Sequence, residues 1–157
     1  MLSVPVLGPL EQVLTKVLNL HRVREYKLED EVRVHVFAMG AGGASAELHV
    51  AVEPGLAPAR LGAGGVHHVA FRTTLAEYEN WAERLVEHGI SSSGPVDRFY
   101  FKSLYFREPN GILFEIATDE PGFSADEPVD SLGMQLALPP FLESRRREIE
   151  AGLKPIE

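Results

Sequence analysis

The chain has 157 residues, and its 23 acidic residues outnumber its 15 Lys and Arg residues, which gives a formal net charge of −8 at pH 7. This acidic balance argues against a nucleic-acid partner, which would favour a basic patch, and against binding to an anionic membrane. The sequence shows no apolar run near the roughly 20 residues that span a bilayer and no signal-peptide pattern at its N-terminus, so we expect a cytoplasmic protein without membrane contact.

Residues 1–53 predict a first unit made of a strand, a helix and three more strands. A short strand pattern at 2–8 precedes a helical pattern at 9–19, in which apolar residues recur every three or four positions and Pro9 suits the first turn. Three further strand patterns follow at 20–28, 31–38 and 46–53. The second of these alternates valines with other residues, as expected of a half-buried strand.

Residues 54–65 are rich in Pro, Gly and Ala and predict a connector. The same order of elements then recurs in residues 66–119. A strand at 66–72 and a helix at 74–89 are followed by strands at 97–101, 103–108 and 112–118. Thr74 and Glu77 fit a capping box at the start of this helix, and Gly89 fits a stop signal at its end.

The repeated pattern predicts an α+β fold in which two βαβββ units pair. One unit alone leaves a face of its small sheet bare, whereas two paired units form a curved mixed sheet with the helices outside. The concave inner face is then the expected pocket. Residues 120–157 form a C-terminal tail with a charge-rich helix at 144–152, whose charges are expected to face water.

Glu115 stands inside an apolar strand pattern, "GILFEIATD". An isolated carboxylate out of water is costly unless it is paired, protonated or bound to a metal. Alternation places Ile112, Phe114 and Ile116 on the face beneath the helices and Glu115 on the concave face, where the first strand of the same unit also places His68. The sequence has no cysteine, so thiolate ligands are excluded. A neutral imidazole and a carboxylate that converge on this face are suitable ligands for a divalent metal.

The hairpin around 109–111 decides which side chain lies opposite Glu115. A three-residue loop with Gly111 in the left-handed position places Tyr105 there. A two-residue loop would place Leu104 there instead. We favour the first register, partly because a phenol beside a metal-binding carboxylate is chemically sensible.

Each of these side chains also has an ordinary structural interpretation. A lone His on a strand is most often a hydrogen-bonded core or edge residue. Arg72 could pair with Glu115 and satisfy it without a metal, and Arg98 could be a surface cation. For Glu115 alone a metal and a salt bridge are equally supported, whereas Glu115 together with His68 favours the metal. The ordinary interpretation is the default for four other histidines, His21, His35, His49 and His88.

The stretches "GAGGVHHVAFR", "DRFYFKSLYFREPNGILFEIATDEPGF" and "LALPPFLESRRREIEAGL" resemble the vicinal oxygen chelate superfamily of glyoxalases, bleomycin-resistance proteins and extradiol dioxygenases. More specifically they resemble the C-terminal half of its hydroquinone-type ring-cleaving dioxygenases. The resemblance implies a glyoxalase-like fold with iron ligands at His68 and Glu115. It also implies that His67, Arg98 and Tyr105 are active-site residues.

This sequence departs from that family in its length, because family members carry a further half that supplies the third metal ligand, a His. By pattern, Ser3 and His49 take in the first unit the positions of His68 and Glu115 in the second. His49 is therefore a candidate third ligand. Otherwise a separate chain supplies the missing half, or the site is incomplete, and we expect a homodimer or such a partner chain.

The leading hypothesis is a non-haem Fe(II) extradiol-type dioxygenase, or the metal-binding half of one, that uses O₂ to open the ring of an aromatic diol or hydroquinone. Another divalent metal is the alternative to iron. Arg98 would stabilise negative charge on substrate oxygen, and His67 or Tyr105 would move protons or hold the substrate hydroxyl. Phe99 and Phe101 would pack on the substrate ring. The alternatives are a non-catalytic small-molecule-binding module and a glyoxalase-like isomerase.

Overall fold

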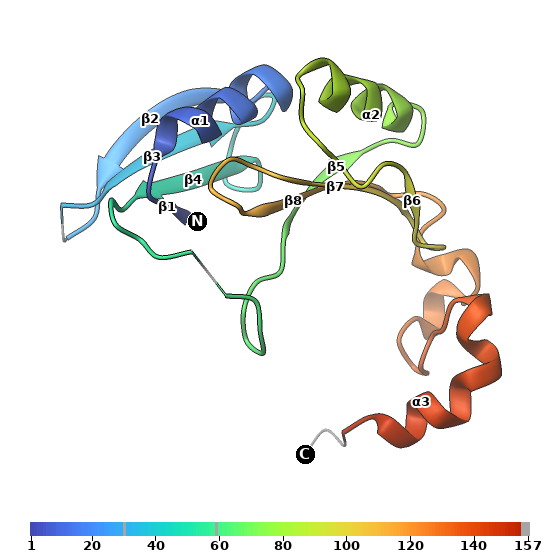
Figure 1. Ribbon diagram of the computed structural model, residues 1–157. Coiled ribbons are helices and arrows are strands. Elements are labelled where there is room, and N and C mark those ends of the chain that lie inside the picture. Colours follow the sequence, from blue (N-terminus) through green and yellow to red (C-terminus); the bar gives the residue numbers. More distant parts are fainter. Residues whose placement is uncertain (30, 59, 155–157) are drawn as a thin grey trace.

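The protein consists of two four-stranded sheets that carry helices on one shared outer side, as Figure 1 shows. The computed structural model describes residues 1–29, 31–58 and 60–154. The first sheet has the strand order β1-β4-β3-β2 and the second the order β5-β8-β7-β6. β1 pairs with β4 in parallel, as β5 does with β8, and all other neighbouring strands are antiparallel. The predicted α+β fold of two paired βαβββ units is confirmed.

The first unit follows the predicted order of elements. Its elements are β1 (Leu2–Val4), α1 (Leu7–Gln12), a π-helical turn (Val13–Val17), β2 (His21–Lys27), β3 (Arg33–Ala38) and β4 (Glu47–Val52). The helix begins earlier than expected and widens at its end, where the Leu18 amide donates to the Val13 carbonyl at 3.0 Å. The edge strand β2 is exposed along all seven residues, and its register against β3 shifts between Arg22 and Arg24.

The second unit repeats this order and leads into the tail. Its elements are β5 (Val69–Thr73), α2 (Tyr78–Glu87), β6 (Val96–Asp97), β7 (Lys102–Arg107) and β8 (Leu113–Thr118). Three 3₁₀ turns follow at Phe123–Ala125, Val129–Ser131 and Pro140–Arg145, and α3 spans Arg146–Gly152.

Two strands of this unit are shorter than predicted. β5 begins at Val69, opposite Phe114, three residues later than predicted. His67 and His68 therefore precede β5. The strand expected at 97–101 ends at Asp97, because Phe99 takes a left-handed φ of 70°, which breaks an extended backbone.

The predicted capping box at Thr74 and Glu77 is wrong in its detail. The Glu77 amide donates to the Thr74 carbonyl at 3.1 Å, which forms a turn ahead of the helix. The helix begins at Tyr78, with Glu77 at its N-cap. The Thr74 hydroxyl donates to the Glu77 carboxylate at 3.3 Å rather than to the helix backbone.

The hairpin between β7 and β8 has the predicted register. Tyr105 lies opposite Glu115. The Glu108 amide donates to the Ile112 carbonyl at 3.0 Å, and Gly111 has a φ of 91°, which favours glycine. The buried Glu108 carboxylate accepts hydrogen bonds from the Ile112 amide and the Asn110 side chain, both at 2.9 Å, so the turn is fixed from within.

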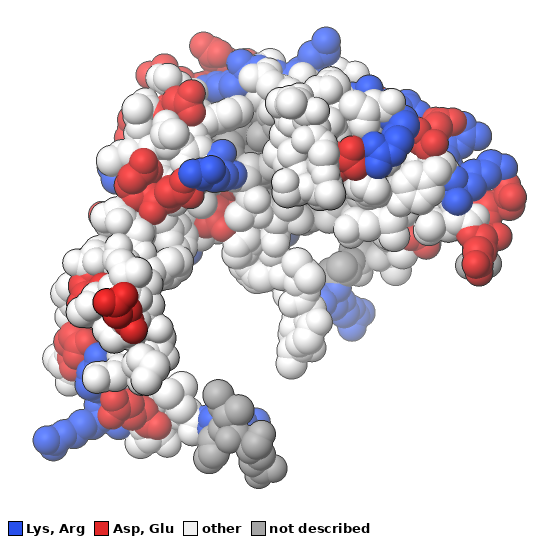
Figure 2. Space-filling view, turned by 180° about the vertical axis from the view of Figure 1, so that it is seen from behind, with Lys and Arg blue, Asp and Glu red and all other residues white. Residues whose placement is uncertain are grey.

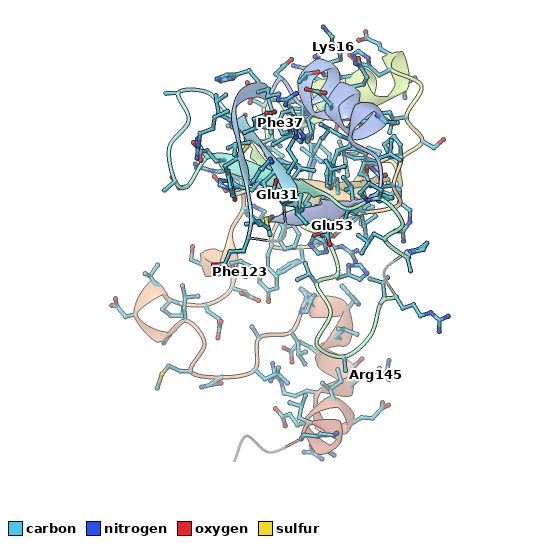
Figure 3. The ribbon with its side chains drawn as sticks, turned by 90° about the vertical axis from the view of Figure 1, so that its left-hand side faces the viewer. Lys16, Glu31, Phe37, Glu53, Phe123 and Arg145 are labelled. Carbon is cyan, nitrogen blue, oxygen red and sulfur yellow. The ribbon has the colours of Figure 1, made fainter. Side chains whose placement is uncertain are left out.

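One apolar core joins the two units between the sheets and the helices. Figure 3 shows Phe37 inside it and Lys16 on its outer side. Burial of each large apolar side chain contributes about 1.5–3 kcal/mol relative to exposure. The core residues are Val4, Leu10, Val13, Leu14, Val17, Leu18, Leu20, Phe37 and Val50 from the first unit and Phe71, Tyr78, Leu85, Leu104, Phe106, Phe114 and Ile116 from the second.

Arg84 on α2 links the helices of the two units. Its guanidinium donates to the carbonyls of Lys16 and Val17, each at 2.6 Å, and to the Asn19 side chain at 2.9 Å. These are the otherwise unpaired carbonyls at the end of the preceding helix, where a cation also suits the helix dipole. The contact is polar and supplements the apolar core across the same boundary.

We expect Arg84→Ala to lower the free energy of unfolding by about 2 kcal/mol, because hydrogen bonds from a charged group to helix-end carbonyls are lost. Urea unfolding monitored by the fluorescence of the single Trp, Trp81, measures this change. Glu83→Ala, an exposed change on the same helix, is the control and should stay within about 0.5 kcal/mol of the parent. Equal stability of both variants would contradict the assigned link.

The Thr73 hydroxyl is buried and has no hydrogen-bond partner within the described residues. We expect Thr73→Val to raise the free energy of unfolding by about 1 kcal/mol, because an unsatisfied buried hydroxyl is removed without loss of shape. Thr118 lies directly opposite on β8 and is the matched control. Its hydroxyl accepts from the Lys102 amide and donates to the Glu120 carbonyl, so Thr118→Val should destabilise. Thermal unfolding compares the two, and destabilisation by both would refute the expectation.

The tail leaves the second sheet as an arm beneath the concave side, as Figure 1 shows. Figure 3 places Phe123 where the arm begins and Arg145 far along it. Figure 2 shows positive and negative side chains interspersed over the outer surface, and the charges of α3 face water as predicted. None of the helices within the described ranges has the length and apolar character to cross a bilayer. The division of the chain into segments 1–53, 54–65, 66–119 and 120–157 stays a prediction.

Candidate functional site

Glu115 lies on the concave face of the second sheet, where it is only 3% exposed. Its neighbours Phe114 and Ile116 point the other way, into the core. The Oε2 atom of Glu115 lies 2.7 Å from Nε2 of His68. The two predicted metal ligands therefore meet, and the imidazole closes over the carboxylate.

The second oxygen of Glu115 is held by Ser103, a residue that the sequence analysis did not single out. The Ser103 hydroxyl donates to Oε1 at 2.5 Å, and Ser103 is fully buried. Ser103 lies on β7 opposite Ala117, which places it diagonally across from Glu115. The signal was present, because Ser103 and Tyr105 are two residues apart on one strand and must share a face.

The other predicted site residues lie around this pair. Nδ1 of His67 is 2.9 Å from Nδ1 of His68. Both residues precede β5, so strand alternation does not set the direction of their rings. The ring of Tyr105 lies edge-on to that of His68 at 5.9 Å between centroids. Arg98 donates to the Tyr105 hydroxyl at 3.3 Å, with its guanidinium carbon 5.2 Å from the centre of that ring.

A short turn presents Arg98 to Tyr105. The Asp97 carboxylate accepts a hydrogen bond from the Phe99 amide at 2.7 Å, and the Arg98 amide donates to the Phe101 carbonyl at 2.8 Å. These bonds stabilise the left-handed backbone at Phe99, which costs energy for a non-glycine residue. Arg98 is exposed and reaches back over the sheet from this turn.

Tyr78 supports the site from the helix side. Its hydroxyl donates to the Ser103 carbonyl at 2.7 Å and accepts from the Val96 amide at 3.2 Å. Burial raises the pKa of the Tyr78 phenol above its ordinary value, so it remains a hydrogen-bond donor at neutral pH. Tyr78 of α2 thus holds the strand that carries Ser103 and Tyr105 from the helix side of the sheet.

Phe99 and Phe101 lie at the root of the arm. Phe99 packs edge-on to Tyr100 at 4.9 Å between centroids, and Phe101 packs on Phe123 at 6.3 Å. The predicted contact of these two rings with a substrate stays a prediction.

The alternative in which Arg72 forms an ion pair with Glu115 is wrong. Arg72 binds Asp119 instead, at 2.5 Å. Arg72 and Glu115 both lie on the concave side, but the parallel register pairs Arg72 with Ala117 and brings it to the end of β8. The side chains in contact with the Glu115 carboxylate are therefore His68 and Ser103.

His49 belongs to a separate polar cluster on the first sheet. Its Nδ1 lies 2.9 Å from the Tyr26 hydroxyl, and its Nε2 lies 3.3 Å from the Glu47 carboxylate. Arg24 holds Glu47 with two hydrogen bonds of 2.7 Å, and this contact lowers the pKa of Glu47 to about 2. Both nitrogens of His49 thus have partners of their own.

The donor set at His68 and Glu115 fits a divalent metal. Two ligands about 2.1 Å from an ion and at right angles to each other are separated by about 3 Å, close to the observed 2.7 Å. The contact of His68 Nδ1 with His67 is the kind of outer contact that orients a ligating imidazole. Within the described parts of the chain, however, no three His, Asp or Glu side chains converge to hold an ion, and His49 is not brought to the pair.

A pocket of about 640 Å³ lies at the boundary between the two units, and neither His68 nor Glu115 lines it. It is lined by side chains from both sheets and by Trp81 of α2. A smaller space of about 150 Å³ lies against His67, Val66 and the β7–β8 hairpin. The chemistry-bearing residues therefore sit on an open concave surface rather than in the larger pocket.

The chain is similar to ring-cleaving dioxygenases. It is 48% identical over 157 residues to a Bacillus subtilis protein named "Putative ring-cleaving dioxygenase MhqA". The alignment covers 99% of this chain and 50% of that protein. It is 36% identical over 118 residues to the chlorohydroquinone/hydroquinone 1,2-dioxygenase of Sphingobium indicum, covering 72% of this chain and 36% of that protein.

The crystal structure of a "putative dioxygenase" from Bacillus subtilis superposes with a TM-score of 0.83 at 34% identity, over 98% of this chain and 48% of that one. The chain thus spans half or less of the length of these relatives. Residues 12–116 match the family described as the Glyoxalase/Bleomycin resistance protein/Dioxygenase superfamily. With the paired βαβββ units described above, this match shows that the chain belongs to that superfamily.

Proposed function

We propose that this chain carries the metal-binding half of a non-haem Fe(II) ring-cleaving dioxygenase that acts on a hydroquinone or another aromatic diol. The observation that carries the proposal is the 2.7 Å approach of His68 to the buried Glu115 carboxylate. The names of the relatives, among them a chlorohydroquinone/hydroquinone 1,2-dioxygenase, support this substrate class. When bound by His68 and Glu115, the ferrous ion would lower the pKa of a substrate hydroxyl and leave positions open for substrate and O₂.

The surrounding residues of the chain take distinct roles in this proposal. Nδ1 of His67 lies 2.9 Å from Nδ1 of His68 and would orient the His68 ring so that its Nε2 faces the metal. Arg98 provides a positive charge for developing negative charge on substrate oxygen. Tyr105, which accepts a hydrogen bond from Arg98, holds the substrate hydroxyl and exchanges a proton with it.

The third protein ligand comes, in this proposal, from the region of the relatives that this chain does not match. His68 and Glu115 supply two ligands, whereas the facial set of such iron sites has three. The relatives contain as much sequence again beyond the matched part, and the concave face that carries the pair is open. Either a separate polypeptide or a second copy of this chain would cover it.

Iron content and oxygen consumption test this function together. Protein loaded with Fe(II) under anaerobic conditions, and supplied with the covering polypeptide, should consume one O₂ for each hydroquinone opened. A substrate-dependent isomerisation without O₂ uptake would favour the glyoxalase-like alternative. Binding of the aromatic compound without any turnover would favour a non-catalytic binding module.

A further inference from the structure

We propose that Ser103 is a positioning residue that presents Oε2 of Glu115 to the metal. The Ser103 hydroxyl donates to Oε1 at 2.5 Å, while Oε2 faces Nε2 of His68 at 2.7 Å. The carboxylate thus has one oxygen committed to the protein and one left for the ion. This inference rests on the proposed function, because it assigns a task to Ser103 only if Glu115 is a ligand.

The sheet register makes this contact specific to one carboxylate oxygen. Ser103 on β7 lies opposite Ala117, and Tyr105 lies opposite Glu115. The serine therefore lies diagonally across from Glu115 on the same face, and the long Glu115 side chain spans the distance to its hydroxyl. His68 arrives from the β5 side, so the two contacts reach the carboxylate from opposite neighbouring strands.

The backbone of Ser103 is itself held in place. The Tyr78 hydroxyl donates to the Ser103 carbonyl at 2.7 Å, and Ser103 has no exposed surface. The backbone of Ser103 is thus anchored to α2, so the position of its hydroxyl is fixed independently of Glu115 and can orient the carboxylate. Partners of this kind behind a metal ligand typically change metal affinity by about 10- to 100-fold.

Titration of the full chain with Mn(II), followed by the EPR signal of the free ion, measures this effect and suits weak affinities. We expect Ser103→Ala to weaken Mn(II) binding by about 10- to 100-fold. Ser103→Thr restores the hydroxyl and should return the affinity to within about 3-fold of the parent. Thr118→Val removes a buried hydroxyl from the same sheet, one that bonds Lys102 and Glu120 instead, and should bind as the parent does.

A double-mutant cycle in metal-free protein tests the hydrogen bond separately. Ser103→Ala and Glu115→Ala should show a coupling of about 10-fold in the unfolding equilibrium constant, because the bond joins a hydroxyl to a charged group. Additive effects of the two substitutions would overturn the contact and the role of Ser103 with it.

The outcomes separate this inference from the proposed function. Loss of Mn(II) binding in Glu115→Ala but not in Ser103→Ala would overturn the role of Ser103 and leave the metal site standing. Unchanged binding in Glu115→Ala, or no binding by the parent at millimolar Mn(II), would overturn the metal site and the role of Ser103 together. Weakening by Ser103→Ala with rescue by Ser103→Thr supports both.

Discussion

Replacing Glu115 or His68 by Ala is expected to lower the affinity for divalent metal by at least about 100-fold, the upper end of the effect that outer partners of metal ligands have. Each substitution removes one of the two ligands that the chain supplies, and water that replaces it holds the ion far less firmly. Calorimetric titration of metal-free protein with Mn(II), or anaerobically with Fe(II), measures the change. Glu115→Gln separates charge from shape, since it keeps the size of the side chain but not the anionic ligand.

His49→Ala is the matched control for this pair. His49 lies on the corresponding strand of the first unit, but Tyr26 and Glu47 occupy its nitrogens. We expect the affinity of His49→Ala to stay within about 3-fold of the parent, a small effect beside the changes ascribed to ligands and their partners. Full metal retention in both His68→Ala and Glu115→Ala would show that the metal binds elsewhere. Loss of metal in His49→Ala would reinstate His49 as a ligand.

The isolated chain is expected to show little or no ring cleavage, and addition of a polypeptide equivalent to the unmatched half of MhqA should raise the rate by at least about 100-fold. The physical reason is the ligand count, because a third protein ligand fixes the ion and a covered concave face excludes water from the site. Oxygen uptake with hydroquinone, with and without the added polypeptide, measures the rise.

Two controls accompany this experiment. His68→Ala with the same added polypeptide should remain inactive, which ties the recovered rate to this chain. Light scattering after size exclusion reports whether the chain alone forms a homodimer that covers its own site. Tight stoichiometric metal binding by the isolated chain that survives His49→Ala would contradict the account of an incomplete site.

The elements and the central pair follow from local rules that a sequence displays. Strand alternation placed Glu115 opposite the core face, and the left-handed glycine at position 111 fixed the register that brings Tyr105 to it. The pairing of His68 with Glu115 followed once both were assigned to the concave face. These inferences depend only on contacts within one unit.

The remaining features depend on contacts that no local pattern encodes. The imidazole rings of His67 and His68 approach each other because both residues precede β5, and the point where a strand ends depends on its pairing partner. The left-handed backbone at Phe99 is an exception, because the hydrogen bond from its amide to Asp97 is local, and the apolar residues that follow Asp97 were assigned to a strand instead. Arg84 reaches carbonyls more than sixty residues away, which requires the packing of two helices to be known first.

The exposed edge strand β2 has a consequence for self-association. A free strand edge is a template for pairing with another chain, and proteins counter this hazard with charges and bulges. Here Arg22, Arg24, Glu25 and Lys27 line the strand, and the register shift between the two arginines disrupts its hydrogen-bonding row. Sheet extension and amyloid-like stacking are thereby disfavoured at this edge.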